Sequence, residues 1–270
     1  MTFDLREASD RNLIGAFAAV IPHVGLGGDV REFDGATAVF SGVASTFFNP
    51  VFALRARVAV ADVAAAVEWI RSRGREPSVQ VRQDLDGALA SGIRGLGLVA
   101  DPWATPGLVL RPIPTVVPPP PAGLRIEAFG APLPESPGSV TRLDEWHDVA
   151  RTSPVFRQVL PASTLGDPNM VFAIGYDPEG GVCQALAVRT DDLIGIYAVG
   201  SIERARRRGF GTAITWAAID AGRRAWGCET AVLQSSAMGL GVYQQMGFLE
   251  VCRYVEYERP PIATEVEATS

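Results

Sequence analysis

The chain has 270 residues, of which 47% are hydrophobic and 20% are charged, so it has the composition of an ordinary globular protein and the length to form a substantial core. Its formal net charge is −6, and all 24 of its Lys and Arg positions are arginine. Only one arginine-rich run stands out, at residues 204–208, which argues against a nucleic-acid partner.

Three cysteines without paired spacing argue against a disulfide framework or a metal site and indicate a reducing compartment. The N-terminal residues lack the charged and apolar regions of a signal peptide, and no uninterrupted apolar run is long enough to span a bilayer. We therefore expect a cytoplasmic protein with no membrane association.

Apolar spacing along the first part of the chain predicts alternating helices and strands. A helix is expected over residues 12–21, where Pro22 should end it. Two strands should follow, and then a helix capped by Asp62 and ended by Gly74. The predicted elements after the first helix are strands at 36–43 and 51–60, a helix at 62–73, a strand at 78–81, a helix at 85–91 and strands at 95–100 and 108–110.

Residues 111–123 hold six prolines and predict an extended connector. This connector would divide the chain into a first domain, residues 1–110, and a second domain, residues 124–259. The polar and acidic residues 260–270 predict a flexible tail.

The second domain follows a similar order of elements. Tight turns between its three central strands predict an antiparallel meander, and the strand after the long helix should lie parallel to the last strand of that meander. The predicted elements are a strand at 125–129, a helix at 139–150, a turn at 156–160, strands at 171–176, 183–188 and 193–199, a helix at 212–224, a strand at 230–234, a short helix at 239–245 and a strand at 248–258.

The loop before the 212–224 helix carries the clearest functional signal. Residues 203–208 hold four arginines, while Gly209 and Gly211 let the backbone approach a ligand closely. The loop amides and the positive end of the helix dipole would point toward the same place. This arrangement predicts a phosphate or pyrophosphate site to which the arginines add charge-assisted hydrogen bonds.

The motif R-x-x-G-x-G at 206–211, between a strand and a helix, and the motif Y-x-x-x-G-F at 243–248 together resemble the GNAT superfamily of acyl-CoA-dependent N-acyltransferases. The match covers about residues 124–258. It implies an α/β fold with a mixed, mostly antiparallel sheet flanked by helices. Because the first domain has a similar order of elements, we expect two GNAT-like units in tandem.

The resemblance implies acetyl-CoA as co-substrate. In the family the loop amides bind the pyrophosphate and the preceding strand binds the pantetheine arm, while a Tyr of the last helix protonates the leaving thiolate. An Asn that often precedes this Tyr is replaced by serine here. The implied cofactor-binding residues are Val199, Ser201, Arg206, Arg207, Arg208, Gly209, Phe210, Gly211, Thr212 and Ser236, and the implied catalytic acid is Tyr243.

The first domain lacks this chemistry. In an alignment of the two domains, residues 88–92 fall where residues 243–247 lie, which places Ala88 at the position of the tyrosine. No Arg- and Gly-rich loop fits between a strand that ends near Val60 and a helix that begins near Asp62. We therefore predict that only the second domain binds acetyl-CoA and that the first is a scaffold or one wall of the acceptor site.

The acceptor side is less defined. An amine must lose a proton before it attacks, so a base is expected. The candidates for this base are Glu145, His147 and Asp148, each of which packing or solvation on the 139–150 helix also explains. The candidates for an aromatic wall of the acceptor site are Phe47, Phe48 and Trp146.

The sequence thus predicts transfer of an acetyl group from acetyl-CoA to a primary amine of a small molecule or peptide. Direct attack in a ternary complex is expected because no cysteine lies in a motif for an acyl-enzyme. Two alternatives stay open, a non-catalytic acetyl-CoA sensor and the transfer of a different acyl group. We expect a monomer or a homodimer.

Overall fold

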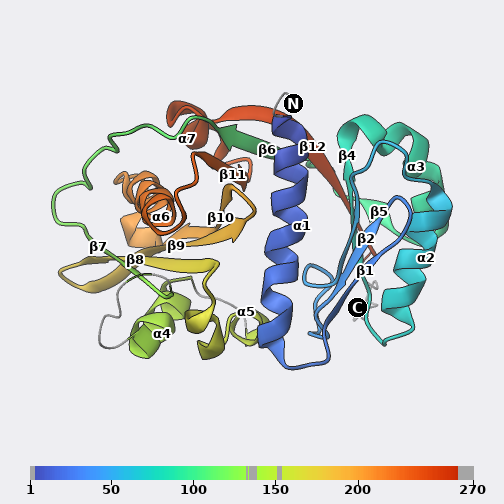
Figure 1. The fold of residues 1–270 in the computed structure, drawn as a ribbon, viewed down its shortest axis with the longest axis horizontal. Helices are drawn as coiled ribbons and strands as arrows, with labels where there is room; N and C mark the ends of the chain where they lie inside the picture. The colour runs from blue at the N-terminus through green and yellow to red at the C-terminus, as the bar shows by residue number, and fades with distance from the viewer. Residues whose placement is uncertain (1–3, 132, 134–138, 151–153, 261–270) are drawn as a thin grey trace, which may run out of the picture.

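The computed structural model describes residues 4–131, 133, 139–150 and 154–260, and its strands form one mixed sheet (Figure 1). The strands are β1 (Asp29–Glu32), β2 (Thr37–Phe40), β3 (Pro50–Ala53), β4 (Ser78–Arg82), β5 (Val99–Ala100), β6 (Thr105–Leu110), β7 (Arg125–Phe129), β8 (Met170–Asp177), β9 (Gly180–Thr190), β10 (Leu193–Ser201), β11 (Thr230–Gln234) and β12 (Leu249–Glu258). The helices are α1 (Leu5–Val24), α2 (Val60–Arg71), α3 (Gln83–Gly95), α4 (Ser139–Ala150), α5 (Pro154–Val159), α6 (Phe210–Trp226) and α7 (Leu240–Gln245), with 3-10 helices η1 (Ala162–Gly166) and η2 (Glu203–Ala205).

The order of the strands across the sheet is β1-β2-β3-β4-β12-β6-β11-β10-β9-β8-β7, with β5 paired to β12. Two pairs in the described sheet, β3 with β4 and β10 with β11, are parallel, and the others are antiparallel. One long helix, α2 or α6, connects the strands of each parallel pair. The predicted α/β class, with a mostly antiparallel sheet flanked by helices, is confirmed.

The two halves of the chain exchange strands at the centre of this sheet. β6 of the first half lies between β11 and β12 of the second half. β12 in turn pairs with β6 along its first part and with β4 and β5 along its last part. Figure 1 shows β12 running across the molecule toward β4. Each half therefore completes its part of the sheet with a strand from the other half.

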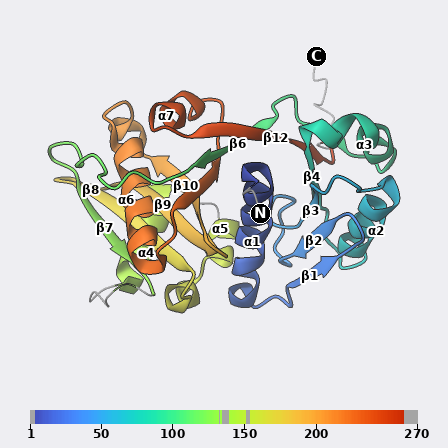
Figure 2. The same cartoon turned by 45° about the horizontal axis from the view of Figure 1, so that its top comes forward.

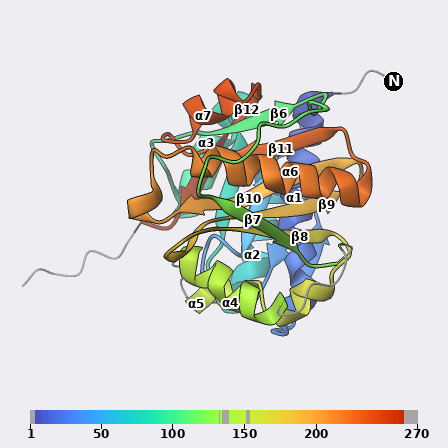
Figure 3. The same cartoon turned by 90° about the vertical axis from the view of Figure 1, so that its left-hand side faces the viewer.

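Helices cover both faces of the sheet. α6 lies on one face of β8, β9 and β10, and α4 and α5 lie on the other, as Figure 3 shows. α2 and α3 pack on the same face as α6, but over β2, β3, β4 and the end of β12. α1 stands between the two halves (Figure 2) and belongs to a core that contains residues of both.

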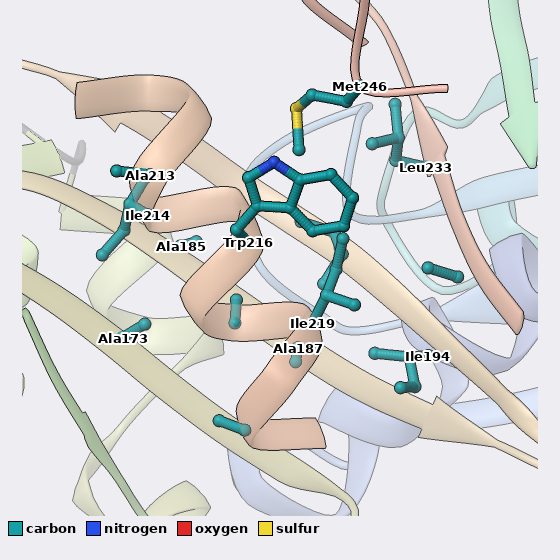
Figure 4. Close-up of a cluster of buried hydrophobic side chains, with 14 of the residues drawn as sticks. Ala173, Ala185, Ala187, Ile194, Ala213, Ile214, Trp216, Ile219, Leu233 and Met246 are labelled. Atoms are coloured by element: carbon teal, nitrogen blue, oxygen red, sulfur yellow. The ribbon is translucent and has the colours of Figure 1, made fainter. Parts of the chain in front are cut away.

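Small strand residues let α6 lie close to the sheet. Ala173, Ala185 and Ala187 are fully buried beneath this helix. The indole of Trp216 then fills the space toward Leu233 and Met246 (Figure 4). Alternating small and large side chains in this way allow dense packing. The core under α6 thus fixes the helix whose N-terminus borders the arginine-rich loop.

Polar side chains anchor α1 to two strands of the second half. The Tyr254 hydroxyl lies 2.9 Å from both Ser9 Oγ and Asp10 Oδ1. The Tyr197 hydroxyl donates to Asn12 Oδ1 at 2.5 Å. Since Tyr254 belongs to β12 and Tyr197 to β10, these buried hydrogen bonds fix α1 over the centre of the sheet.

The predicted bounds of this first helix were wrong at both ends. The helix begins at Leu5 because Asp4 accepts hydrogen bonds from two amides of the first turn. Of the three residues that its first turns bury, Ala8, Ser9 and Asp10, two are polar, so apolar spacing did not reveal these turns. Pro22 does not end the helix but lies in its last turn, before Gly25 with a φ of 71°.

The first half also differs from its predicted alignment with the second. α3 continues through Gly92, where an added Cβ would lie 2.3 Å from Val60 Cγ1, so this glycine allows close packing against α2 rather than ending the helix. The residue that matches Gly247 (φ 93°) is Gly97 (φ 81°), which likewise precedes a strand. The counterpart of Tyr243 is therefore the fully buried Ile93, not Ala88.

A loop is also present where none was expected to fit. β3 ends at Ala53 and α2 begins at Val60, so residues 54–59 connect them. This loop has the sequence LRARVA, with two arginines and no glycine. It lacks the residues that would let its backbone approach an anion closely.

The division of the chain at residues 111–123 stays a prediction. This segment has no helix or strand and is attached to the second half, since Ile113 N donates to Glu229 O at 3.1 Å and Arg223 Nη1 donates to Pro114 O at 3.0 Å. The expected flexible tail lies, after residue 260, outside the described residues. Within the described chain, no helix combines the length and apolar character needed to cross a membrane.

The burial of Asp10 makes stability depend on pH. Burial raises the pKa of Asp10 from 3.8 to about 6, against the opposing effects of the Tyr254 hydroxyl and Arg82. The folded state therefore binds the proton more tightly than the unfolded state, so this carboxyl lowers the free energy of unfolding as pH rises from about 4 to about 6. Relative to Asp10→Asn, the wild-type free energy of unfolding should fall by up to about 3 kcal/mol over this range. Urea unfolding of both proteins from pH 4 to 7 tests this, and a constant difference between them would contradict it.

Candidate functional site

β10 carries a bulge near its C-terminal end. Its register with β9 runs from Tyr197↔Leu186 to Gly200↔Gln184, so two residues of β10, Ala198 and Val199, face one of β9. Ala198 has a φ of 50°, in the left-handed region that few non-glycine residues adopt. The bulge interrupts the hydrogen bonds of the sheet at this point.

Gln184 fixes the bulge from the neighbouring strand. Its Nε2 donates to Ala198 O at 3.2 Å. The same side chain fills the space beside Gly200, where an added Cβ would lie 2.5 Å from Nε2. Gln184 and Gly200 therefore act together, and no local pattern in the sequence marks this pair.

The strands β10 and β11 separate just before the bulge. Their parallel pairing stops at Ile196↔Leu233, and Ser235 N instead donates to Pro106 O of β6. A cavity of about 340 Å³ lies at this opening. Its lining includes three of the residues predicted to bind the cofactor or act as the acid, namely Val199, Ser236 and Tyr243.

The arginine-rich loop turns sharply at Arg207 (φ 60°) and Gly209 (φ 78°) before α6 begins. No described residue accepts a hydrogen bond from the backbone amides of residues 207–212. This set includes the predicted Phe210, Gly211 and Thr212. Ser201 borders the loop, because its Oγ is 4.0 Å from the Cβ position of Gly211. Free amides at a helix N-terminus form an anion site.

The arginines of the loop fall into two groups. Arg204 and Arg208 both approach Asp177, with Arg204 Nη2 3.1 Å from Oδ1 and Arg208 Nη1 3.7 Å from Oδ2. The Arg208 guanidinium also lies 4.4 Å from the centre of the Phe210 ring. Arg206 and Arg207 are exposed and form no ion pair with a described residue. The second group is thus available to an incoming anion.

Tyr243 of α7 lines the cavity with a neutral phenol. Burial raises its pKa, and the Thr215 hydroxyl opposes this rise. Its ring packs against Phe248 at 5.9 Å between centroids. Thr215 Oγ1 in turn donates to Gly211 O at 2.8 Å. A protonated phenol held in this way can donate a proton near neutral pH.

The side chains considered as bases lie elsewhere. His147 is 3% exposed, with Nε2 3.0 Å from Leu160 O, and burial lowers its pKa. Glu145 accepts a hydrogen bond from the Tyr176 hydroxyl, and Asp148 pairs with Arg157. Among the described residues that line the cavity, none belongs to α4.

The aromatic residues proposed for the acceptor wall are separated in the structure. Trp146 is fully buried, and its Nε1 donates to Ala185 O at 3.0 Å, so it is a core residue. Phe47 lines the cavity at the bulge. Phe47 and Phe48 also line a second, apolar cavity of about 240 Å³.

One wall of the cavity at the bulge contains the predicted Phe47 together with residues that were not predicted. It is formed by Leu13 and Phe17 of α1, by Phe47, Gln80 and Thr105 of the first half, and by Tyr254 and Glu256 of β12. Glu256 Oε1 and Gln234 Nε2 are buried, and neither has a hydrogen-bond partner among the described residues. Burial raises the pKa of Glu256, Glu258 adds to the rise, and Ser78 and Gln80 oppose it. A carboxylate beside a cavity with one buried oxygen that has no partner among the described residues is typical of a ligand-binding or catalytic group.

Sequence comparison finds no matching protein-family model and no matching curated protein. Solved structures do match. A GCN5-related N-acetyltransferase from Kribbella flavida aligns with a TM-score of 0.66 and 18% identity, over 91% of this chain and 95% of that one. The chain has the GNAT fold.

Two further solved structures with the GNAT fold also align with this chain. A GCN5-related N-acetyltransferase from Sphaerobacter thermophilus aligns with a TM-score of 0.58 and 19% identity, over 84% of this chain and 78% of that one. A tandem GNAT protein from the clavulanic acid biosynthesis pathway aligns with a TM-score of 0.56 and 14% identity, over 84% of this chain and 79% of that one. The resemblance predicted from the loop motif is thus confirmed at the level of the fold.

The bulge offers a direct test of the role of Gly200. Gly200→Ala should lower the free energy of unfolding by about 1–3 kcal/mol, because the new methyl group overlaps Gln184. Gly241→Ala is the matched control, since no atom lies within 4 Å of its Cβ position and alanine favours the helix. Chemical unfolding of both variants measures the difference. Equal stability of the two variants would remove Gly200 from the packing of the bulge.

Proposed function

We propose that this protein is an N-acetyltransferase that transfers the acetyl group of acetyl-CoA to a primary amine by direct attack. The observation that carries the proposal is the arrangement of three features along one opening of the sheet. These are the free amides of the loop before α6, the bulge where β10 leaves β11, and Tyr243 in the cavity beyond it. The loop amides would bind CoA, the bulge would supply an amide for the thioester oxygen, and Tyr243 would protonate the departing thiolate.

The proposed cofactor site follows the loop and the bulged strand. The amides of residues 207–212 and the dipole of α6 would bind the pyrophosphate, with Arg206 and Arg207 adding charge. Val199, Ser201 and Ser236 would contact the pantetheine arm at the opening between the strands. Arg208 would act mainly by shaping the loop through Asp177 and Phe210.

The proposed chemistry needs a donor for the oxyanion and an acid for the thiolate. An amide released from the sheet by the bulge at Ala198 and Val199 is suited to hydrogen-bond the developing oxyanion. The neutral phenol of Tyr243 would protonate the thiolate of CoA. Burial raises the pKa of Cys183 to about 12 and also raises the pKa values of Cys228 and Cys252, which disfavours an acyl-enzyme.

The loop assignment predicts the effect of a carboxylate at its centre. Gly209→Glu should weaken acetyl-CoA binding at least about 100-fold, because it places a negative charge beside the pyrophosphate. Gly227→Glu is the matched control, since it has a similar φ of 70° at the other end of the same helix and an open Cβ position. Isothermal titration measures both affinities. A folded Gly209→Glu variant with the affinity of its control would refute the loop assignment.

If Tyr243 is the acid, its removal should change kcat but not the affinity for acetyl-CoA. Tyr243→Phe should lower kcat by about 100-fold while the Kd for acetyl-CoA stays unchanged, because only the proton is lost. Tyr176→Phe is the control, since that hydroxyl donates to Glu145 outside the cavity. The release of CoA thiol with an amine acceptor gives the rate. A wild-type kcat would exclude Tyr243 as the acid, and binding of acetyl-CoA without turnover of any amine would favour the sensor.

A further inference from the structure

Two cavities of different character meet at the bulge. The cavity of about 340 Å³ and the apolar cavity of about 240 Å³ share the lining residues Phe17, Phe47, Tyr197 and Ala198. The larger one contains polar side chains at its far wall, while the smaller one continues between aromatic and aliphatic side chains of α1, α5 and β9. Together they form a space with one polar and one apolar end.

Glu256 sets the charge of the polar end. Among the described residues that line the larger cavity, it is the only acidic one, and none is Arg or His. β12 holds it opposite Gln80 of β4, and Oε1 has no partner among the described residues. The orphaned Gln234 Nε2 belongs to the same lining. This wall therefore suits one cationic group with additional hydrogen-bonding capacity.

The volume of the apolar cavity limits the size of the apolar group attached to the cation. Cavities of about 150 Å³ accommodate benzene, so about 240 Å³ has room for one aromatic ring with a short alkyl arm. Phe48 and Phe156, whose ring centroids are 5.4 Å apart, offer edges and faces to such a ring. A second charged group in this part of the space would be desolvated without a partner.

We propose that the acceptor is an amphipathic primary amine, with its single ammonium group on Glu256 and its aromatic or aliphatic body in the apolar cavity. This inference rests on the proposed acetyltransferase function and narrows its substrate class. Polyamines and aminoglycosides are disfavoured because they bring several charges to a space with one carboxylate.

Glu256 would also be the base of the reaction, directly or through water. It takes one proton from the ammonium, and the freed lone pair forms the N–C bond to the thioester carbon. The C–S bond breaks and the thiolate takes the phenol proton of Tyr243. One of the two protons on the nitrogen returns to the Tyr243 oxygen, and the other stays as the N–H of the product amide. The proton on Glu256 then passes to solvent, so each turnover releases one proton. The charged or titratable groups around Glu256 are Glu258, Asp101 and Tyr254, and none of them supplies a competing cation.

The apolar cavity could instead hold a longer acyl chain, so the experiment varies the two substrates separately. With acetyl-CoA, kcat/KM for 2-phenylethylamine should exceed that for spermidine by at least about 100-fold. Octanoyl-CoA should give no gain over acetyl-CoA with ethylamine as acceptor. A preference for spermidine, or a gain with octanoyl-CoA alone, would overturn the inference while leaving acyltransfer intact. Failure of every amine would overturn the proposed function as well.

Two variants test the two ends of the space. Glu256→Gln should lower kcat/KM for 2-phenylethylamine by about 100-fold, and the deficit should shrink as pH approaches the pKa of the free amine, because a neutral amine needs no base. Its Kd for acetyl-CoA should match that of the control Glu250→Gln, which lies on the same strand outside the cavity. A deficit independent of pH would overturn the role of Glu256 as base.

At the apolar end, Ala16→Leu adds bulk to the smaller cavity alone. It should raise KM for 2-phenylethylamine at least about 10-fold and leave the kinetics with ethylamine unchanged. Equal effects on both amines would show that the body of the acceptor does not occupy this cavity.

Discussion

The pairing of β12 with strands of both halves is the constraint on which the site depends. Successive side chains of a strand alternate between faces, so this register places Tyr254 and Glu256 toward α1 and places Val255 and Tyr257 in the core under α2 and α3. A slip of one residue would reverse both sets. The second half alone therefore lacks a complete cavity, because much of the wall opposite Tyr243 comes from the first half.

The position of α1 follows from the same pairing. Buried polar side chains stabilise a fold only when they are satisfied, and Asp10 meets Tyr254 and Arg82 only where β12 and β4 lie side by side. Two glycines then permit close approach to the sheet. An added Cβ at Gly15 would lie 2.4 Å from Thr190 Cγ2, and one at Gly195 would lie 2.1 Å from Asn12 Oδ1. The helix is thereby held over the place where β10 and β11 separate.

Local sequence signals predicted the elements that local interactions determine. The bounds of β7, α4 and β11 agree with prediction because turn residues flank clear apolar patterns. The residues that escaped prediction depend on distant pairings, as Glu256 depends on β4 and Gln184 on the bulge of β10. The alignment of the halves was wrong because glycine has more than one physical role. Gly92 permits close packing of α3 against α2, whereas Gly97 has the positive φ that corresponds to that of Gly247.

The two sides of the opening carry opposite charges, and this difference would direct the two substrates to different sides. The loop at residues 203–209 carries four arginines in a chain of net charge −6, whereas the described lining of the cavity carries a carboxylate and no arginine. A polyanionic cofactor and a cationic acceptor would therefore be attracted to different sides. Between them lie Ile196 and Val199, whose apolar side chains suit an uncharged arm. In the proposed reaction only such an arm and its thioester cross the sheet, so the opening between β10 and β11 never has to desolvate a charge.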